Sequence, residues 1–324
     1  MNNFKKIGLT ALAASLVSVS AHAGELSVSG AASMNVGGYS GDEHDGGATF
    51  SMGNQITFTG GGELDNGMTV SLSFQLDNGT ANAVNGNFDD HSVTISSDTM
   101  GSLTLHGHGG GSATSAMDAT AAGNVWDTFD GARGQVTAVG HSNSAPGNNS
   151  LSYTAPTIMD GVAVNLSYEP QQSGNSIDSG MGYAVTYTGI EGLTLVYSNS
   201  DEVGTTADLS GDQTAWKVSY AYGPVTATMT QSELDVTTTT SDQDVSSMAV
   251  SYTISDEMSV TYGTETIEST SSGHVDAEYT VIKGSYTAGG MTVSAQVKSA
   301  ENVDHSTNAN ADFDYWGLGL AFAF

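Results

Sequence analysis

The chain has 324 residues, with 35 acidic residues, only six basic residues and no cysteine. An acid excess of this size repels a phosphate backbone, which argues against nucleic-acid binding. The lack of cysteine excludes disulfide scaffolds, thiolate zinc sites, iron–sulfur clusters and cysteine nucleophiles. Because 38% of the residues are hydrophobic and 13 are tyrosines, we expect the chain to fold in spite of its charge.

Residues 1–23 have the three parts of an export signal. Lys5 and Lys6 give a positive start, a short and mostly apolar stretch follows, and the segment ends in a small-x-small cleavage site at Ala23. The alternative is a buried N-terminal helix. We expect residues 1–23 to be a signal peptide and residues 24–324 to be the mature protein. No later apolar run is long enough for a transmembrane helix.

After the expected signal, large apolar residues alternate with small or polar ones. In the last segment Trp316, Leu318 and Leu320 share one parity, while Gly317 and Gly319 lie on the other. A β-strand places such residues on opposite faces. The same period of two recurs along the chain and a helical period is hardly seen, so the sequence predicts an all-β protein.

Short and long connections alternate between these segments. The long polar stretches lie near residues 37–49, 77–90, 107–134, 170–180, 199–211, 235–243, 268–275 and 301–312. Seven short turns rich in Asp, Asn and Gly lie between them, as at residues 64–67 and 190–192. Eight long and seven short connections predict sixteen antiparallel strands, with short turns at one end of the sheet and long loops at the other. This pattern is typical of a transmembrane β-barrel.

A secreted β-sandwich, adhesin or β-solenoid is the alternative fold. The hydrophobic fraction is sufficient for one lipid-facing layer but not for a second buried layer, which a sandwich needs. The apolar faces often end in an aromatic residue near a turn, as at Tyr168, Tyr187 and Tyr252, where a membrane-interface girdle would lie. Both features favour the membrane barrel.

Two stretches of the sequence, residues 98–107 and 314–324, resemble segments of a known family, the Gram-negative general porins. Residues 314–324 resemble the closing strand of that family, including the terminal Phe324, and residues 98–107 resemble its turn into the fifth strand. The resemblance implies that residues 24–324 form a porin β-barrel in the outer membrane and that the barrel is a homotrimer. It also implies an inward-folded third extracellular loop, and that the outer-membrane assembly machinery reads Phe324. The family commonly has a cluster of wall arginines, which a mature chain with one arginine lacks.

The third long stretch, residues 107–134, is the longest and is the expected pore constriction. We expect Asp118, Asp127 and Asp130 to line the narrowing, with Arg133 facing them or anchoring the loop's return to the wall. Trp126 and Phe129 favour burial of the loop against the inner wall, because bulky aromatic side chains are disfavoured in a free loop. The alternative is a solvated cap outside the barrel.

The three lysines of the mature chain are assigned to the lumen wall. Lys217 and Lys298 are out of phase with the apolar residues around them, and a lysine facing mid-bilayer lipid costs about 2–4 kcal/mol. Lys283 follows if Ile282 faces lipid, but Val281 leaves that strand ambiguous. The alternative is that all three are solvated wall lysines without a selective role.

The expected function is a water-filled, weakly cation-selective channel for passive diffusion of small hydrophilic solutes, because an acid-rich pore concentrates cations. The alternatives are a substrate-specific channel, for which Tyr315 and Tyr153 are the hints of a lumen aromatic row, and an adhesin without a pore. We expect no enzyme activity and no cofactor. Acidic loops such as residues 42–46 are candidate Ca²⁺ ligands, although solvated surface charge is the favoured explanation for them.

Overall fold

A computed structural model describes most of the chain outside its N-terminus. The described residues are 26–41, 47–77, 89–110, 113–117, 119–129, 148–170, 179–202, 211–236, 242–269, 275–307 and 311–324. The expected signal peptide and the acidic segment 42–46 lie outside these ranges.

The described residues form sixteen strands and three short 3-10 helices. The strands are β1 (Ser27–Ser40), β2 (Thr49–Glu63), β3 (Thr69–Asp77), β4 (His91–Ser97), β5 (Gly101–His108), β6 (Ser150–Thr154), β7 (Val162–Glu169), β8 (Gly180–Tyr187), β9 (Leu193–Glu202), β10 (Gly211–Tyr222), β11 (Val225–Val236), β12 (Gln243–Ser255), β13 (Met258–Ser269), β14 (Ala277–Ala288), β15 (Met291–Glu301) and β16 (Phe313–Ala323). The 3-10 helices are η1 (Ala113–Met117), η2 (Val125–Thr128) and η3 (Val303–His305).

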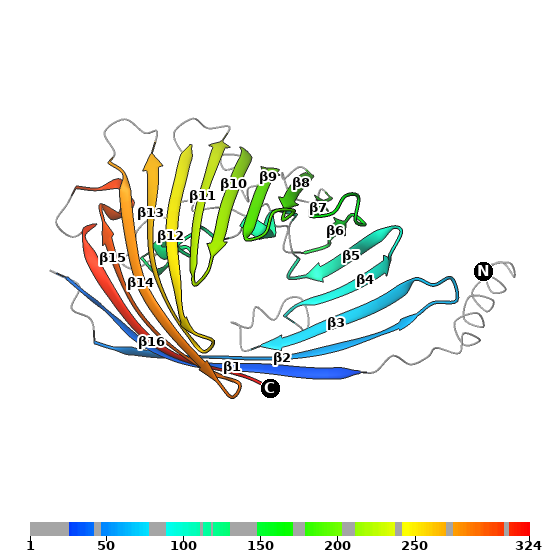
Figure 1. Cartoon of the computed structure of the whole chain (residues 1–324), viewed down its shortest axis with the longest axis horizontal. Coiled ribbons are helices and arrows are strands. Elements are labelled where there is room, and N and C mark those ends of the chain that lie inside the picture. The colour runs from blue at the N-terminus through cyan, green and yellow to red at the C-terminus, as the bar shows by residue number, and fades with distance from the viewer. Residues whose placement is uncertain are drawn as a thin grey trace, which may run out of the picture.

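The strands close into one antiparallel barrel in chain order, as Figure 1 shows. Closure joins the first and last strands, with Met34 on β1 opposite Leu320 on β16. Closure removes the free sheet edges, so every strand has two neighbours. The prediction of an all-β, sixteen-stranded antiparallel barrel is confirmed.

The two faces of the wall follow the predicted parity. Large apolar side chains on the outer face are exposed, as at Val218, Val250 and Leu318, where no other part of the protein covers them. A band of exposed apolar side chains around a closed barrel is the surface that lipid covers in an outer membrane. Among the described residues, no helix is long and apolar enough to cross a membrane.

The described short turns lie at one end of the barrel, and the strand ends that lead into the long connections lie at the other. Figure 1 shows the short turns of β10–β11, β12–β13 and β14–β15 at the lower end of these strands. The third long connection extends to Asn149, beyond the expected end near residue 134, and Asn149 adopts a left-handed backbone (φ 57°) before β6 begins. In outer-membrane barrels the short turns face the periplasm and the long loops face outward.

The barrel seam is completed by the last residue. Gly30 on β1 donates its backbone N–H to the Phe324 carbonyl (2.7 Å), and the Phe324 N–H donates to the Gly30 carbonyl (3.0 Å). The aromatic ring of Phe324 lies over Gly30, where a Cβ atom would overlap it. The glycine therefore makes room for the terminal ring on the outer face of the seam.

We predict that Gly30→Ala lowers the free energy of unfolding of the barrel by about 1 kcal/mol, because the added methyl group displaces the Phe324 ring and exposes apolar surface. Gly60→Ala is the matched control, since a Cβ there meets nothing closer than Leu26 Cδ1 at 3.7 Å. The measurement is the free energy of unfolding of the purified barrel in urea. In a Phe324→Ala background the cost of Gly30→Ala should vanish. Equal effects of the two glycine substitutions would contradict this account.

Candidate functional site: the loop inside the barrel

The described part of the third loop, residues 113–117 and 119–129, follows the inner wall of the barrel (Figure 1). Helix η1 contacts β7 to β10, and Met117 packs on Val196 and Ala215 in a small buried cluster. Helix η2 contacts β13 and β14. The loop thus passes from one side of the lumen wall to the other.

An apolar cluster holds the far end of the loop. Val125 and Phe129 are fully buried, and they join a group of wall residues that includes Ile267, Val281 and Phe313. The ring of Phe129 meets that of Phe313 edge-on, with centroids 5.1 Å apart. Burial of this apolar surface favours the inward position of the loop over a solvated position outside the barrel.

Wall hydroxyl groups bind the loop backbone between these two clusters. The N–H of Ala121 donates to Thr230 Oγ1 on β11 (2.9 Å), and the N–H of Ala122 donates to Ser247 Oγ on β12 (2.9 Å). Ser247 Oγ in turn donates to the Thr264 carbonyl on β13 (2.8 Å). The serine and threonine residues of the lumen face therefore satisfy loop groups that burial removes from water.

Glu265 on β13 is the one buried acid of the described residues, with 1% of its surface exposed. Its Oε2 accepts the Thr120 hydroxyl (2.5 Å) and the Val125 N–H (3.4 Å), and its Oε1 accepts the Trp126 N–H (3.1 Å). Thr120 Oγ1 also accepts the N–H of Asn124 (2.9 Å), which closes the turn. One carboxylate thus gathers three donors from the loop.

Two wall lysines also bind the loop. Lys283 Nζ on β14 donates to the Ala122 carbonyl (3.2 Å), and Lys298 Nζ on β15 donates to Thr128 Oγ1. Val281, which left the strand ambiguous in sequence, is buried on the same face as Lys283, beneath the loop, while Ile282 is 57% exposed on the outer face. The apolar residue of the lumen face is therefore explained by the loop that covers it.

The aromatic side chains of the lumen pack around the end of the loop. Tyr39 on β1 donates its hydroxyl to the Thr128 carbonyl (2.6 Å), and its ring lies 5.1 Å from that of Tyr315. Gly37 leaves the space that the Tyr315 ring occupies. Tyr153, the other hint of a lumen aromatic row, is opposite the exposed Leu103 and donates to the Met100 carbonyl (2.8 Å), so its placement in the lumen was wrong.

The sequence-predicted constriction residues are only partly described. Asp127 is exposed on the loop, Trp126 is partly buried, and Phe129 is fully buried. Asp118, Asp130 and Arg133 lie outside the described residues. Lys217 is partly exposed on the inner face of β10.

Sequence reasoning missed Glu265, Thr120 and Tyr39. A signal for Glu265 was present, because it shares the lumen parity of Thr261 and Gly263 in the middle of a strand. The other two gave no signal, since threonine and tyrosine recur throughout the strands.

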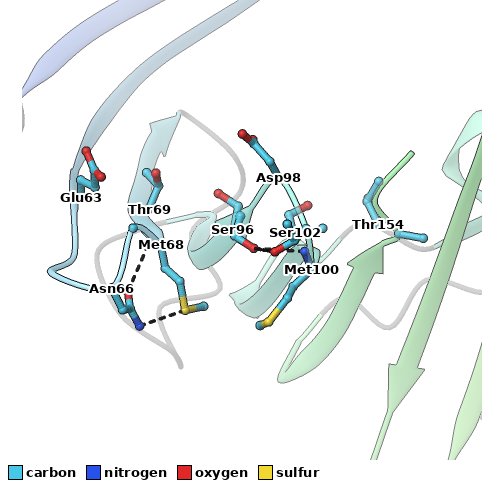
Figure 2. A pocket seen from close by; sticks show the side chains of 14 residues that line it. Glu63, Asn66, Met68, Thr69, Ser96, Asp98, Met100, Ser102 and Thr154 are labelled. Atoms are coloured by element: carbon cyan, nitrogen blue, oxygen red, sulfur yellow. Dashed lines mark hydrogen bonds between the residues drawn. The ribbon is translucent and has the colours of Figure 1, made fainter. Parts of the chain in front are cut away.

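A polar cavity of about 840 Å³ lies at the short-turn end of the barrel. Its floor is a row of hydroxyls, one from each neighbouring strand: Thr69, Ser96, Ser102 and Thr154, which lie opposite one another in register. Figure 2 shows this row together with the carboxylates of Glu63 and Asp98. On these four strands the lumen face is thus hydrophilic down to the periplasmic mouth.

Within the described ranges, no group of three or more His, Asp or Glu side chains is arranged to hold a metal ion. The acidic segment 42–46 is not described, so Ca²⁺ binding there stays a prediction.

The sequence matches the family model for Gram-negative porins over residues 8–324. A comparison with curated proteins finds no match. Among solved structures, an anion-selective porin from Comamonas acidovorans is similar at a TM-score of 0.67 and 15% identity, over 93% of this chain and 99% of that one.

A triple mutant of the Rhodopseudomonas blastica porin is similar at a TM-score of 0.65 and 17% identity, over 93% of this chain and 100% of that one. At these identities the structural likeness shows the fold. Porins of this fold are channels rather than enzymes. The match over nearly the whole sequence, together with the closed barrel, shows that the chain belongs to the Gram-negative porin family and is a porin of the bacterial outer membrane.

Proposed function

We propose that the barrel is a weakly cation-selective channel for passive diffusion of small hydrophilic solutes. The observation that carries this proposal is the placement of carboxylates along the water path. Asp77, Asp89 and Asp90 gather at the loop end of β3 and β4, Asp127 is exposed on the inward loop, and Glu63 and Asp98 line the periplasmic mouth. Fixed negative charge along a pore raises the local concentration of cations.

The weakness of the selectivity follows from the acids that face away from the pore. Asp212 lies between Asp201 and Asp235, and Asp244 lies between Glu233 and Glu268. All six share the parity of the outer apolar residues. Their charge acts mainly on the outer surface, because salt screens it over about 10 Å at 0.1 M. The large net charge of the chain therefore overstates the charge of the lumen.

The constriction is proposed to be the inward loop, with Asp127 in the narrowing and Asp118, Asp130 and Arg133 as its expected continuation. Lys283 and Lys298 serve it as anchors. The aromatic residues Tyr39 and Tyr315 pack against the loop end rather than forming a row along the lumen, which favours general diffusion over a substrate-specific channel.

Four expectations from the sequence belong to the same proposal. Residues 1–23 direct export and are removed, Phe324 is read by the barrel assembly machinery, the mature barrels form a homotrimer, and the acidic outer loops are candidates for Ca²⁺.

The test of selectivity is the reversal potential across a potassium chloride gradient in a planar bilayer. The wild-type channel should give the sign of a cation-selective pore. Asp127→Asn should lower the cation preference, because it removes a charge from the narrowing. Asp235→Asn, which makes the same change on the outer face, should leave it nearly unchanged. An anion-selective sign for the wild type would overturn the proposal.

Cation preference should also fall as the pH is lowered. Burial, with the neighbouring charges of Asp77 and Asp90, raises the pKa of Asp89 above its usual value. A carboxyl with a raised pKa is charged above that pKa and becomes neutral as the pH falls through it. Reversal potentials measured from neutral to acidic pH should therefore begin to decline before an ordinary aspartate titrates. In Asp89→Asn the first part of the decline should be missing. A decline unchanged in that variant would assign the effect to other groups.

The role of Glu265 as the anchor of the constriction predicts a clear mutant phenotype. In Glu265→Ala two loop N–H groups lose their acceptor in a buried place, at a cost of about 1–3 kcal/mol each. We expect a noisier open-channel current and faster proteolysis of the loop in the folded barrel.

Glu265→Gln should be milder, because its amide oxygen still accepts. Glu268→Gln is the control for charge, since Glu268 lies on the same strand but is exposed on the outer face. A quiet, protease-resistant Glu265→Ala channel would show that the apolar cluster holds the loop alone.

A further inference from the structure

The three lysines of the lumen wall differ in what their ammonium groups contact. Lys283 donates to the Ala122 carbonyl, and Lys298 donates to the Thr128 hydroxyl. Lys298 also interacts electrostatically with Asp127 and Glu265. Each of these two ammonium groups therefore has a hydrogen bond to a loop oxygen, and two nearby carboxylates offset the charge of Lys298.

Lys217 has a different setting. It lies opposite Val196 on β9 and Thr230 on β11. With the described residues its ammonium group makes no hydrogen bond or ion pair, and the side chain is partly exposed. Its neighbours along the lumen face of β10 are Ala215 and Ser219, so no carboxylate of these flanking positions offsets its charge.

Lys217 also lies at the height of the loop. Val196, its partner on β9, packs against Met117, and Thr230, its partner on β11, accepts the N–H of Ala121. The lysine thus stands on the wall between two loop attachments, at the edge of the narrowing. A charge at the narrowest part of a pore acts on every ion that passes.

We infer that, among the basic residues that the structure describes, Lys217 is the one that admits anions to this channel, by offering chloride and small carboxylates an ammonium group beside the constriction. The inference rests on the proposed diffusion function. Lys283 and Lys298 act as positioning residues for the loop and have a smaller direct effect on anions.

The experiment compares Lys217→Gln with Lys283→Gln and Lys298→Gln, three variants with the same formal charge change. Reversal potentials are measured in planar bilayers at about 0.1 M and about 1 M potassium chloride. Lys217→Gln should raise the ratio of cation to anion permeability about two- to five-fold at the lower salt and less at the higher salt, where screening weakens the interaction. Lys217→Arg should retain the wild-type ratio, because it keeps the charge.

Lys283→Gln and Lys298→Gln should instead increase current noise and loop proteolysis, with a smaller shift in the permeability ratio. A Lys217→Gln shift no larger than theirs would overturn the inference. Lys217→Glu provides a second measurement, with a shift in the same direction and larger than that of Lys217→Gln. The sign of the wild-type reversal potential tests the proposed cation selectivity, whereas the shift on substitution tests Lys217 whichever sign the wild type has.

Discussion

The wall of this protein is a single β-sheet, so each strand must present one face to lipid and the other face to water. With side chains alternating between the faces, that requirement imposes a period of two on nearly every segment. Closure adds a second requirement, because a sheet in a membrane cannot leave backbone donors and acceptors unpaired at an edge. The pairing of β1 with β16, completed by Gly30 and Phe324, meets it.

The inward loop changes which residue types suit the lumen face of the wall that it covers. Where water touches the lumen face, serine and threonine predominate. Where the loop covers the wall, Ile267 and Val281 occupy lumen positions, and a carboxylate, Glu265, is buried because loop donors replace its water. The departures from the simple alternation on β13 and β14 therefore mark the place where the loop lies, and they serve to position it.

The sequence alone was enough for the strand number, the closure and the two faces, because these follow from the period of two and from the alternation of short and long connections. The inward course of the third loop came instead from the resemblance to the porins and from the bulky side chains of Trp126 and Phe129. The partners of the loop were not predictable, since they depend on which wall residues meet residues 113–129 across the lumen. Val281 illustrates the limit. Its place in the strand puts it on the lumen face, where an apolar side chain is not expected, and only the loop that covers it explains why valine is suitable there. Tyr153 is a different case, because it shares the parity of Leu151 and lies out of phase with Ser150 and Ser152. The alternation therefore already indicated the outer face, and only the aromatic residue type suggested the lumen.

The same distinction between faces governs the electrostatics. A carboxylate on the outer rim and one beside the pore contribute equally to the net charge of the chain, but only the second lies within a screening length of a passing ion. Among the described residues the lysines are divided in the same way, since Lys283 and Lys298 hold the loop and Lys217 does not. Selectivity in a barrel of this kind is therefore set by the few charges that face water at the narrowing, and composition gives only its upper limit.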